Sequence, residues 1–185
     1  QGNNTITAHR IVAWLDRNGI EGYGSEGTER VVMTIYSEPV DGTSTPEAQP
    51  ENTDPQQPSL ITIESDVLTY DQAQGFSLFT GKVNARQNGM AIQSDEMRVY
   101  LADSQESGKN EIERIEVMGN VRIVQDTFIV TGEEGGFLNA EQSAVIKGTE
   151  EQQARAENSA EKSILNADMI TILLESDDIQ AKGNV

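Results

Sequence analysis

The stretch Ile92-Gln93-Ser94-Asp95-Glu96-Met97-Arg98-Val99-Tyr100-Leu101 decides the fold, because its pattern occurs five times in the chain. The common form is an apolar residue, any residue, a small residue and an acid, followed by apolar residues at alternate positions. His9 replaces the acid in one copy, and the copy around Glu133 retains the pattern only in part. Such repetition is typical of a fold that stacks similar units. The other four copies are residues 6–15, 63–70, 130–137 and 165–174.

A glycine follows each copy at a regular distance. The distance from the acid (or His9) to the glycine is 15 residues in four copies and 24 residues in the copy of Asp95. The extra nine residues fall around the polar run 103–110, and 14 residues separate Gly81 from Asp95 and Gly119 from Glu133. The underlying period is therefore 29 residues. The pairs are His9/Gly24, Asp66/Gly81, Asp95/Gly119, Glu133/Gly148 and Asp168/Gly183.

Each copy alternates like a β-strand, but its apolar phase slips by one at the small–acidic pair. Ile92 and Ser94 share one phase, whereas Met97 and Val99 share the other. A slip by one would turn the buried side chains outward unless the backbone bends or bulges there. We therefore predict a corner at each small–acidic pair, with the carboxylate capping turn amides. The sequence predicts a repeat-built, wound, all-β structure.

Composition excludes several classes of protein. The chain has 185 residues and a net charge of −18, which argues against nucleic acid as a partner, because phosphates require Lys and Arg. Cysteine is absent, so neither a disulfide nor a zinc–thiolate site is expected. No apolar run reaches the roughly 20 residues of a membrane-spanning helix, so no transmembrane segment is predicted. We interpret the two ends as those of a mature or trimmed chain.

We expect a single domain over residues 1–185, in which two polar segments interrupt the 29-residue repeat. Residues 38–59 contain all five prolines, five acids and no base, a composition typical of a mobile and dispensable loop. Residues 149–163 are rich in Glu, Gln and Ala, and we expect a short surface helix or a disordered loop there.

A search for chemistry finds no catalytic residue, no cofactor motif and no metal site. Phosphate-binding loops and hydrolase or metalloprotease motifs are absent, and the one histidine, His9, is interpreted as a polar corner residue. Trp14 is assigned to packing. The repeated acids would form a column if the units stack, and such a column could bind Ca²⁺. The favoured interpretation is that each acid closes its own corner. We predict that the protein is not an enzyme.

The small–acidic corners, Tyr70-Asp71 before a turn and Gly119-Asn120-Val121 on the next strand resemble the OstA-like family. This family comprises LptA, the jelly-roll domain of LptC and the periplasmic N-terminal domain of LptD. The resemblance covers nearly all of residues 61–185 and, more weakly, 6–36. It implies a twisted, partly open β-jelly roll, or β-taco. It also implies a periplasmic location in a Gram-negative bacterium, in some cases with outer-membrane association, and a role in lipopolysaccharide transport.

The resemblance further implies two sets of functional residues. Acyl chains of lipopolysaccharide or a related lipid would lie in the apolar interior, and the protein would join other Lpt-type domains, or copies of itself, edge to edge. The alternative is a structural β-solenoid, a scaffold or surface protein with a filled core and no lipid. The expected interior residues are Ile63, Phe79, Val83, Met97, Val117, Val121, Ile123, Phe137, Ile146 and Ile172. The expected edge residues are Ile6, Ile11, Leu165, Ile170, Ile172 and Leu174.

Overall fold

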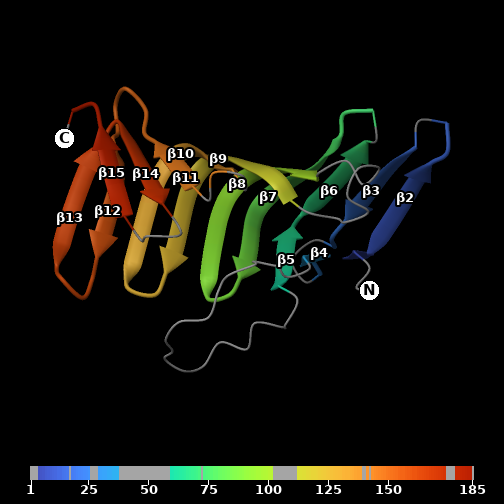
Figure 1. Ribbon diagram of the computed structural model, residues 1–185. Helices are drawn as coiled ribbons and strands as arrows, with labels where there is room; N and C mark the ends of the chain where they lie inside the picture. The colour runs from blue at the N-terminus through green and yellow to red at the C-terminus, as the bar shows by residue number, and fades with distance from the viewer. Residues whose placement is uncertain are drawn as a thin grey trace, which may run out of the picture.

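Antiparallel strands make up nearly all of the computed structural model, which describes residues 4–16, 18–25, 29–37, 59–71, 73–101, 112–138, 141, 143–173 and 178–184. Fifteen strands lie within these residues, and the two termini lie at opposite ends of the molecule (Figure 1). The predicted all-β class is confirmed. The strands are β1 (Thr5–Thr7), β2 (Arg10–Trp14), β3 (Gly19–Tyr23), β4 (Val31–Ser37), β5 (Ser59–Ser65), β6 (Val67–Asp71), β7 (Phe76–Gln87), β8 (Met90–Leu101), β9 (Ile112–Gln125), β10 (Phe128–Leu138), β11 (Ser143–Lys147), β12 (Ala154–Asn158), β13 (Ser163–Ala167), β14 (Met169–Leu173) and β15 (Asp178–Lys182).

The strands form one folded sheet with two halves. The four long strands β7 to β10 run through both halves, and the shorter strands belong to one half each. We call the half with the order β1-β4-β5-β7-β8-β9-β10-β12-β13 half-sheet I. Half-sheet II has the order β2-β3-β6-β7-β8-β9-β10-β11-β14-β15. The two halves face each other, as in an open jelly roll.

A crease separates the half-sheets, and the repeated acid–glycine pairs form it. Asp66 lies between β5 and β6 and contacts Gly81 of β7: a Cβ atom placed on Gly81 would lie 2.5 Å from Asp66 Oδ2. Asp95 contacts Gly119 in the same way, at 2.6 Å. Asp168 contacts Gly183, so the pairing recurs at the far end of the sheet. The predicted corners are therefore confirmed at these three acids.

The backbone at the crease has the bulges that the phase slip predicted. The β7–β8 register shifts between Thr80 and Val83, and the β8–β9 register shifts between Gln93 and Glu96. Gly81 and Gly119 have φ angles of 83° and 77°, a region that residues with a Cβ rarely adopt. In the partly retained fourth copy, the β9–β10 register shifts between Gly132 and Glu134. Glu133 therefore lies on the same crease as the other repeated acids.

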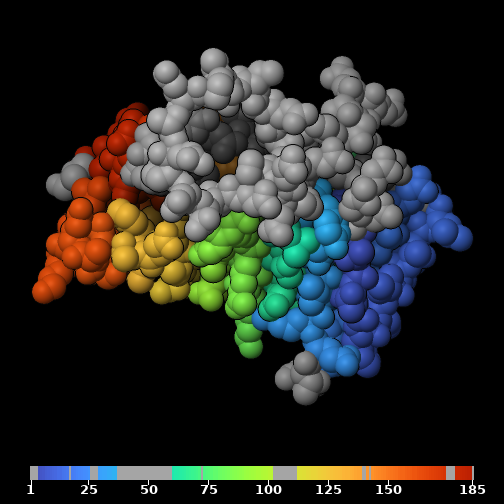
Figure 2. Space-filling model, turned by 60° about the horizontal axis from the view of Figure 1, so that its bottom comes forward, coloured from blue at the N-terminus to red at the C-terminus, as the bar shows by residue number. Residues whose placement is uncertain are grey.

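Side chains that point between the half-sheets form the core. Along β8, Met97 and Val99 are buried, whereas Glu96 and Arg98 point outward and remain partly exposed. The same alternation continues on the neighbouring strands, which follow one another in chain order along the molecule (Figure 2). The largest fully buried side chains include Phe79, Ile63 and Leu68. Burial of a side chain of this size stabilises the fold by roughly 1.5–3 kcal/mol.

The expectation for residues 149–163 was wrong. This segment contains β12, which pairs with β10 and β13 and is neither a helix nor a loop. Ala154, Ala156 and Asn158 alternate inward and are buried, while Arg155 and Glu157 form an ion pair on the outer face. The alternation was present, but alanine carries too little hydrophobicity to reveal it. The proline-rich segment lies outside the described residues, apart from Ser59, which begins β5.

The strand pairing at the ends of the half-sheets shows that some of the predicted edge residues do not lie on edge strands. Strands β1 and β2 form the two edges at the N-terminal end, so Ile6 and Ile11 do lie on edge strands. At the other end, β13, which carries Leu165, and β15 are the edges. Ile170 and Ile172 lie on β14, which is not an edge, because β11 and β15 pair with it on both sides. Leu174 lies outside the described residues.

Replacing Gly119 with alanine should destabilise the protein more than replacing Gly89. Both glycines have positive φ (77° and 86°), so both variants incur roughly 1–2 kcal/mol of backbone strain. A Cβ at Gly119 also collides with Asp95, whereas one at Gly89 meets nothing within 4 Å. The collision should add about 1–3 kcal/mol. Urea denaturation measures the difference, and equal losses in the two variants would contradict the proposed packing of the crease.

Candidate functional site

A cavity of about 310 Å³ lies between the half-sheets. Its walls come from β5, β7, β8 and β9 on one side and from β9, β10, β11 and β14 on the other. The lining is predominantly apolar, and the volume lies at the lower end of the roughly 300–1,000 Å³ typical of small-molecule sites. The apolar lining residues are Ile61, Ala85, Met90, Ile92, Ile112, Ile115, Val117, Ile123, Phe137, Ala144, Ile146 and Ile172.

Some side chains that point between the half-sheets fill the core, and others line the cavity. Phe79 and Met97, two residues from the crease positions Gly81 and Asp95, are fully buried and do not line the cavity. Ile115 and Ile172, four residues from Gly119 and Asp168, do line it. Val117 and Ile146, two residues from Gly119 and Gly148, also line it, so the cavity reaches toward the crease among β9, β10 and β11.

The ten residues predicted to line the interior therefore divide into two groups of five. Val117, Ile123, Phe137, Ile146 and Ile172 line the cavity. Ile63, Phe79, Val83, Met97 and Val121 are packed beside the crease. The prediction missed lining residues such as Ile61, Ile92 and Ile112, which lie on the same inward phase of their strands.

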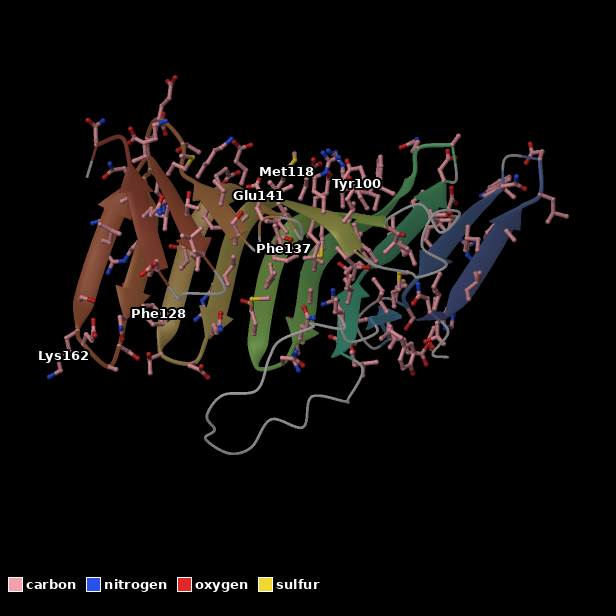
Figure 3. All side chains as sticks on the ribbon, in the orientation of Figure 1. Tyr100, Met118, Phe128, Phe137, Glu141 and Lys162 are labelled. Atoms are coloured by element: carbon pink, nitrogen blue, oxygen red, sulfur yellow. The ribbon has the colours of Figure 1, made fainter. Side chains whose placement is uncertain are left out.

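The outer face of half-sheet II differs from the cavity wall behind it. Arg114 stacks on the Tyr100 ring with its Cζ 3.9 Å from the ring centroid, and the Tyr100 hydroxyl donates a hydrogen bond to Glu116. Met118 is 42% exposed on this outer face (Figure 3). Phe137, on the neighbouring strand β10, points inward to the cavity. The inner face is thus apolar, and the outer face carries paired charges and aromatic rings.

The crease acids do not assemble into a metal site. Asp95 accepts a hydrogen bond from Asn120 Nδ2 at 2.7 Å, Asp168 accepts one from the Asn184 N–H at 3.0 Å, and Asp66 lies 3.8 Å from Arg30. Among the described residues, no group of three or more His, Cys, Asp or Glu side chains is close enough to hold a metal ion. Each of the three carboxylates thus has its own local partner. His9 likewise has a partner, Glu29, at 2.8 Å.

The fold places this protein in the class of open β-jelly-roll modules with an apolar interior. Comparison with known proteins identifies the family. The chain belongs to the family described as LptA/(LptD N-terminal domain) LPS transport protein, whose model matches residues 62–178. The resemblance inferred from the repeats is thereby confirmed. No helix within the described part of the chain is both long and apolar enough to cross a membrane.

Two individual proteins are also similar to this chain. An uncharacterized protein of Rhizobium meliloti (strain 1021) is 32% identical over 114 residues, which cover 60% of this chain and 61% of that protein. The match therefore spans less than two thirds of the relative. LptH is described as the LptA homologous periplasmic component of the lipopolysaccharide transport device of Pseudomonas aeruginosa. Its crystal structure matches with a TM-score of 0.56 and 14% identity, over 67% of this chain and 82% of LptH, which shows a shared fold.

Proposed function

We propose that this chain is a non-catalytic periplasmic module that holds acyl chains of lipopolysaccharide, or a related lipid, between its half-sheets. The apolar cavity is the observation that carries the proposal. Each Å² of apolar surface that an acyl chain and the cavity wall remove from water contributes about 25 cal/mol. A preformed gap between two rigid half-sheets gains this energy with little rearrangement of the protein.

Membership of the lipopolysaccharide transport family supports the lipid and the location. LptH, which shares the fold, is a periplasmic component of such a device. The lining supports binding rather than catalysis: among the described residues that line the cavity there is no acid, histidine or hydroxyl nucleophile.

The packing beside the crease favours a second candidate, a structural β-solenoid without a ligand. Phe79, Met97 and Leu68 are 0% exposed, so this half of the interior is filled by the protein itself. The two candidates differ in the content of the wide half of the interior. A lipid-binding module has a lipid against Phe137 during transport, whereas a scaffold has none.

A photo-crosslinking amino acid should separate these candidates. With p-benzoylphenylalanine at Phe137, ultraviolet light should attach lipopolysaccharide to the protein in a lipopolysaccharide-producing host, because this side chain lines the cavity. The same probe at Met118, on the outer face of the same half-sheet, is the control and should give little product. Immunoblots for lipopolysaccharide measure both. A folded Phe137 variant without adduct, or equal labelling at both positions, would contradict the lipid assignment.

We further propose that the module assembles edge to edge with like domains, which would be its partners beside the lipid. The edges β1 and β2 at one end, and β13 and β15 at the other, each have a strand partner on one side only. Unpaired edge strands offer N–H and C=O groups to an incoming strand. Ile6, Leu165 and Ile179 pack against the core near these edges, so a paired copy would extend the apolar interior. Contact between different ends is heterologous and gives open chains.

Engineered disulfides should report this assembly, since the chain has no native cysteine. The double variant Val12→Cys/Gln180→Cys places cysteines on the edge strands β2 and β15. Oxidation should give a ladder of dimers and longer chains on a non-reducing gel. The control pair, Val12→Cys/Thr171→Cys, uses the internal strand β14 and should stay largely monomeric. No ladder from the edge pair at high protein concentration would count against assembly through these two strands.

A further inference from the structure

The part of the cavity nearest the crease lies over a single glycine. Val117 on β9 and Ile146 on β11 are the lining residues closest in sequence to the repeated glycines. Both pair with Gly135 of β10, one from each side. The next residues of the same row, Met97 and Ile170, are fully buried and do not line the cavity. The cavity therefore reaches toward the crease where Gly135 leaves this row without a side chain.

The side chain of Ile146 packs over Gly135 and over a second glycine of β10. A Cβ atom placed on Gly135 would lie 2.6 Å from Ile146 Cδ1, and one placed on Gly132 would lie 2.5 Å from Ile146 Cγ2. Neither glycine is among the residues with positive φ, so close packing, rather than backbone conformation, requires glycine at both positions. A glycine inside a strand is typical of a place where another group approaches closely. The Cδ1 methyl of Ile146 thus occupies part of the gap over Gly135.

This end of the cavity is closed to polar groups. Strands β9 and β10 continue through the crease and pair with each other again in half-sheet I, so the sheet itself closes the interior there. The side chains beside the gap, Val117 and Ile146, are apolar and offer no hydrogen bond. A polar head group would lose its hydrogen bonds to water at this end, whereas a terminal methyl group has none to lose. An amphiphile should therefore place the methyl end of its chain here.

We propose that Ile146 sets the length of the linear acyl chain that the cavity accepts, because the terminal methyl group of the chain meets its Cδ1 atom. The inference rests on the proposed lipid function and adds the residue that determines chain-length specificity. Each methylene that enters the cavity should tighten binding about fourfold. A methylene beyond the limit should add little, because a close-packed wall yields only at a cost.

A series of amphiphiles that differ only in chain length tests this proposal on the whole chain, residues 1–185. Isothermal titration calorimetry measures the affinity of n-alkyl maltosides from octyl to tetradecyl, in steps of one carbon and below their critical micelle concentrations. For the wild-type protein, a plot of log Kd against chain length should fall by a constant step and then level off. The chain length at which it levels off is the limit that Ile146 sets.

Two substitutions should move this limit in opposite directions. Ile146→Val removes the Cδ1 methyl over Gly135 and should raise the limit by about one carbon, with about fourfold tighter binding of the first chain beyond the wild-type limit. Val117→Ile adds a methyl on the other side of the same gap and should lower the limit by about one carbon. Ile170→Val is the matched control, because Ile170 pairs with Ile146 and is 0% exposed but does not line the cavity. Near-ultraviolet circular dichroism checks that each variant is folded.

The possible results separate this inference from the proposed function. If the maltosides bind but their affinity shows no limit, or if Ile146→Val and Ile170→Val change the limit equally or not at all, the role of Ile146 is wrong and the lipid cavity stands. If no maltoside binds the wild-type protein, the lipid function falls, and the role of Ile146 falls with it. A limit that moves with Ile146→Val and Val117→Ile, and not with Ile170→Val, would support both.

Discussion

The contact between each repeated aspartate and a glycine on the next strand is the constraint on which the structure depends. The carboxylate occupies the space that a Cβ atom of Gly81 or Gly119 would need, so the strands bend sharply where they pass each other. Positive φ at both glycines gives the backbone the conformation for this bend. Because the contact recurs along the sheet, it produces a continuous crease rather than isolated kinks. The two half-sheets and their facing apolar surfaces follow from it.

The interior between the half-sheets both fills with side chains and leaves a cavity. Phe79 and Met97 are fully buried and do not line the cavity. Ile115 and Ile172, together with Val117 and Ile146, border an apolar space. One part of the interior thus stabilises the fold, and the other part is the proposed binding site.

Local features of the structure could be predicted from the sequence, and features that depend on spatial arrangement could not. The corners at Asp66, Asp95 and Asp168 could be predicted, because the slip of the apolar phase and the spacing to glycine are local signals. The position of β14 between β11 and β15 depends on which strands pair, so Ile170 was wrongly placed at an edge. The cavity depends on which strands face one another across the interior.

Native mass spectrometry of the protein purified from a lipopolysaccharide-producing bacterium tests the central claim most directly. If the wide half of the interior holds acyl chains, part of the protein should carry a bound mass equal to a lipopolysaccharide species. Protein from cells that lack lipopolysaccharide should appear without that mass. Folded protein that emerges from the producing cells with no bound lipid at any concentration would contradict the account and favour a filled structural scaffold.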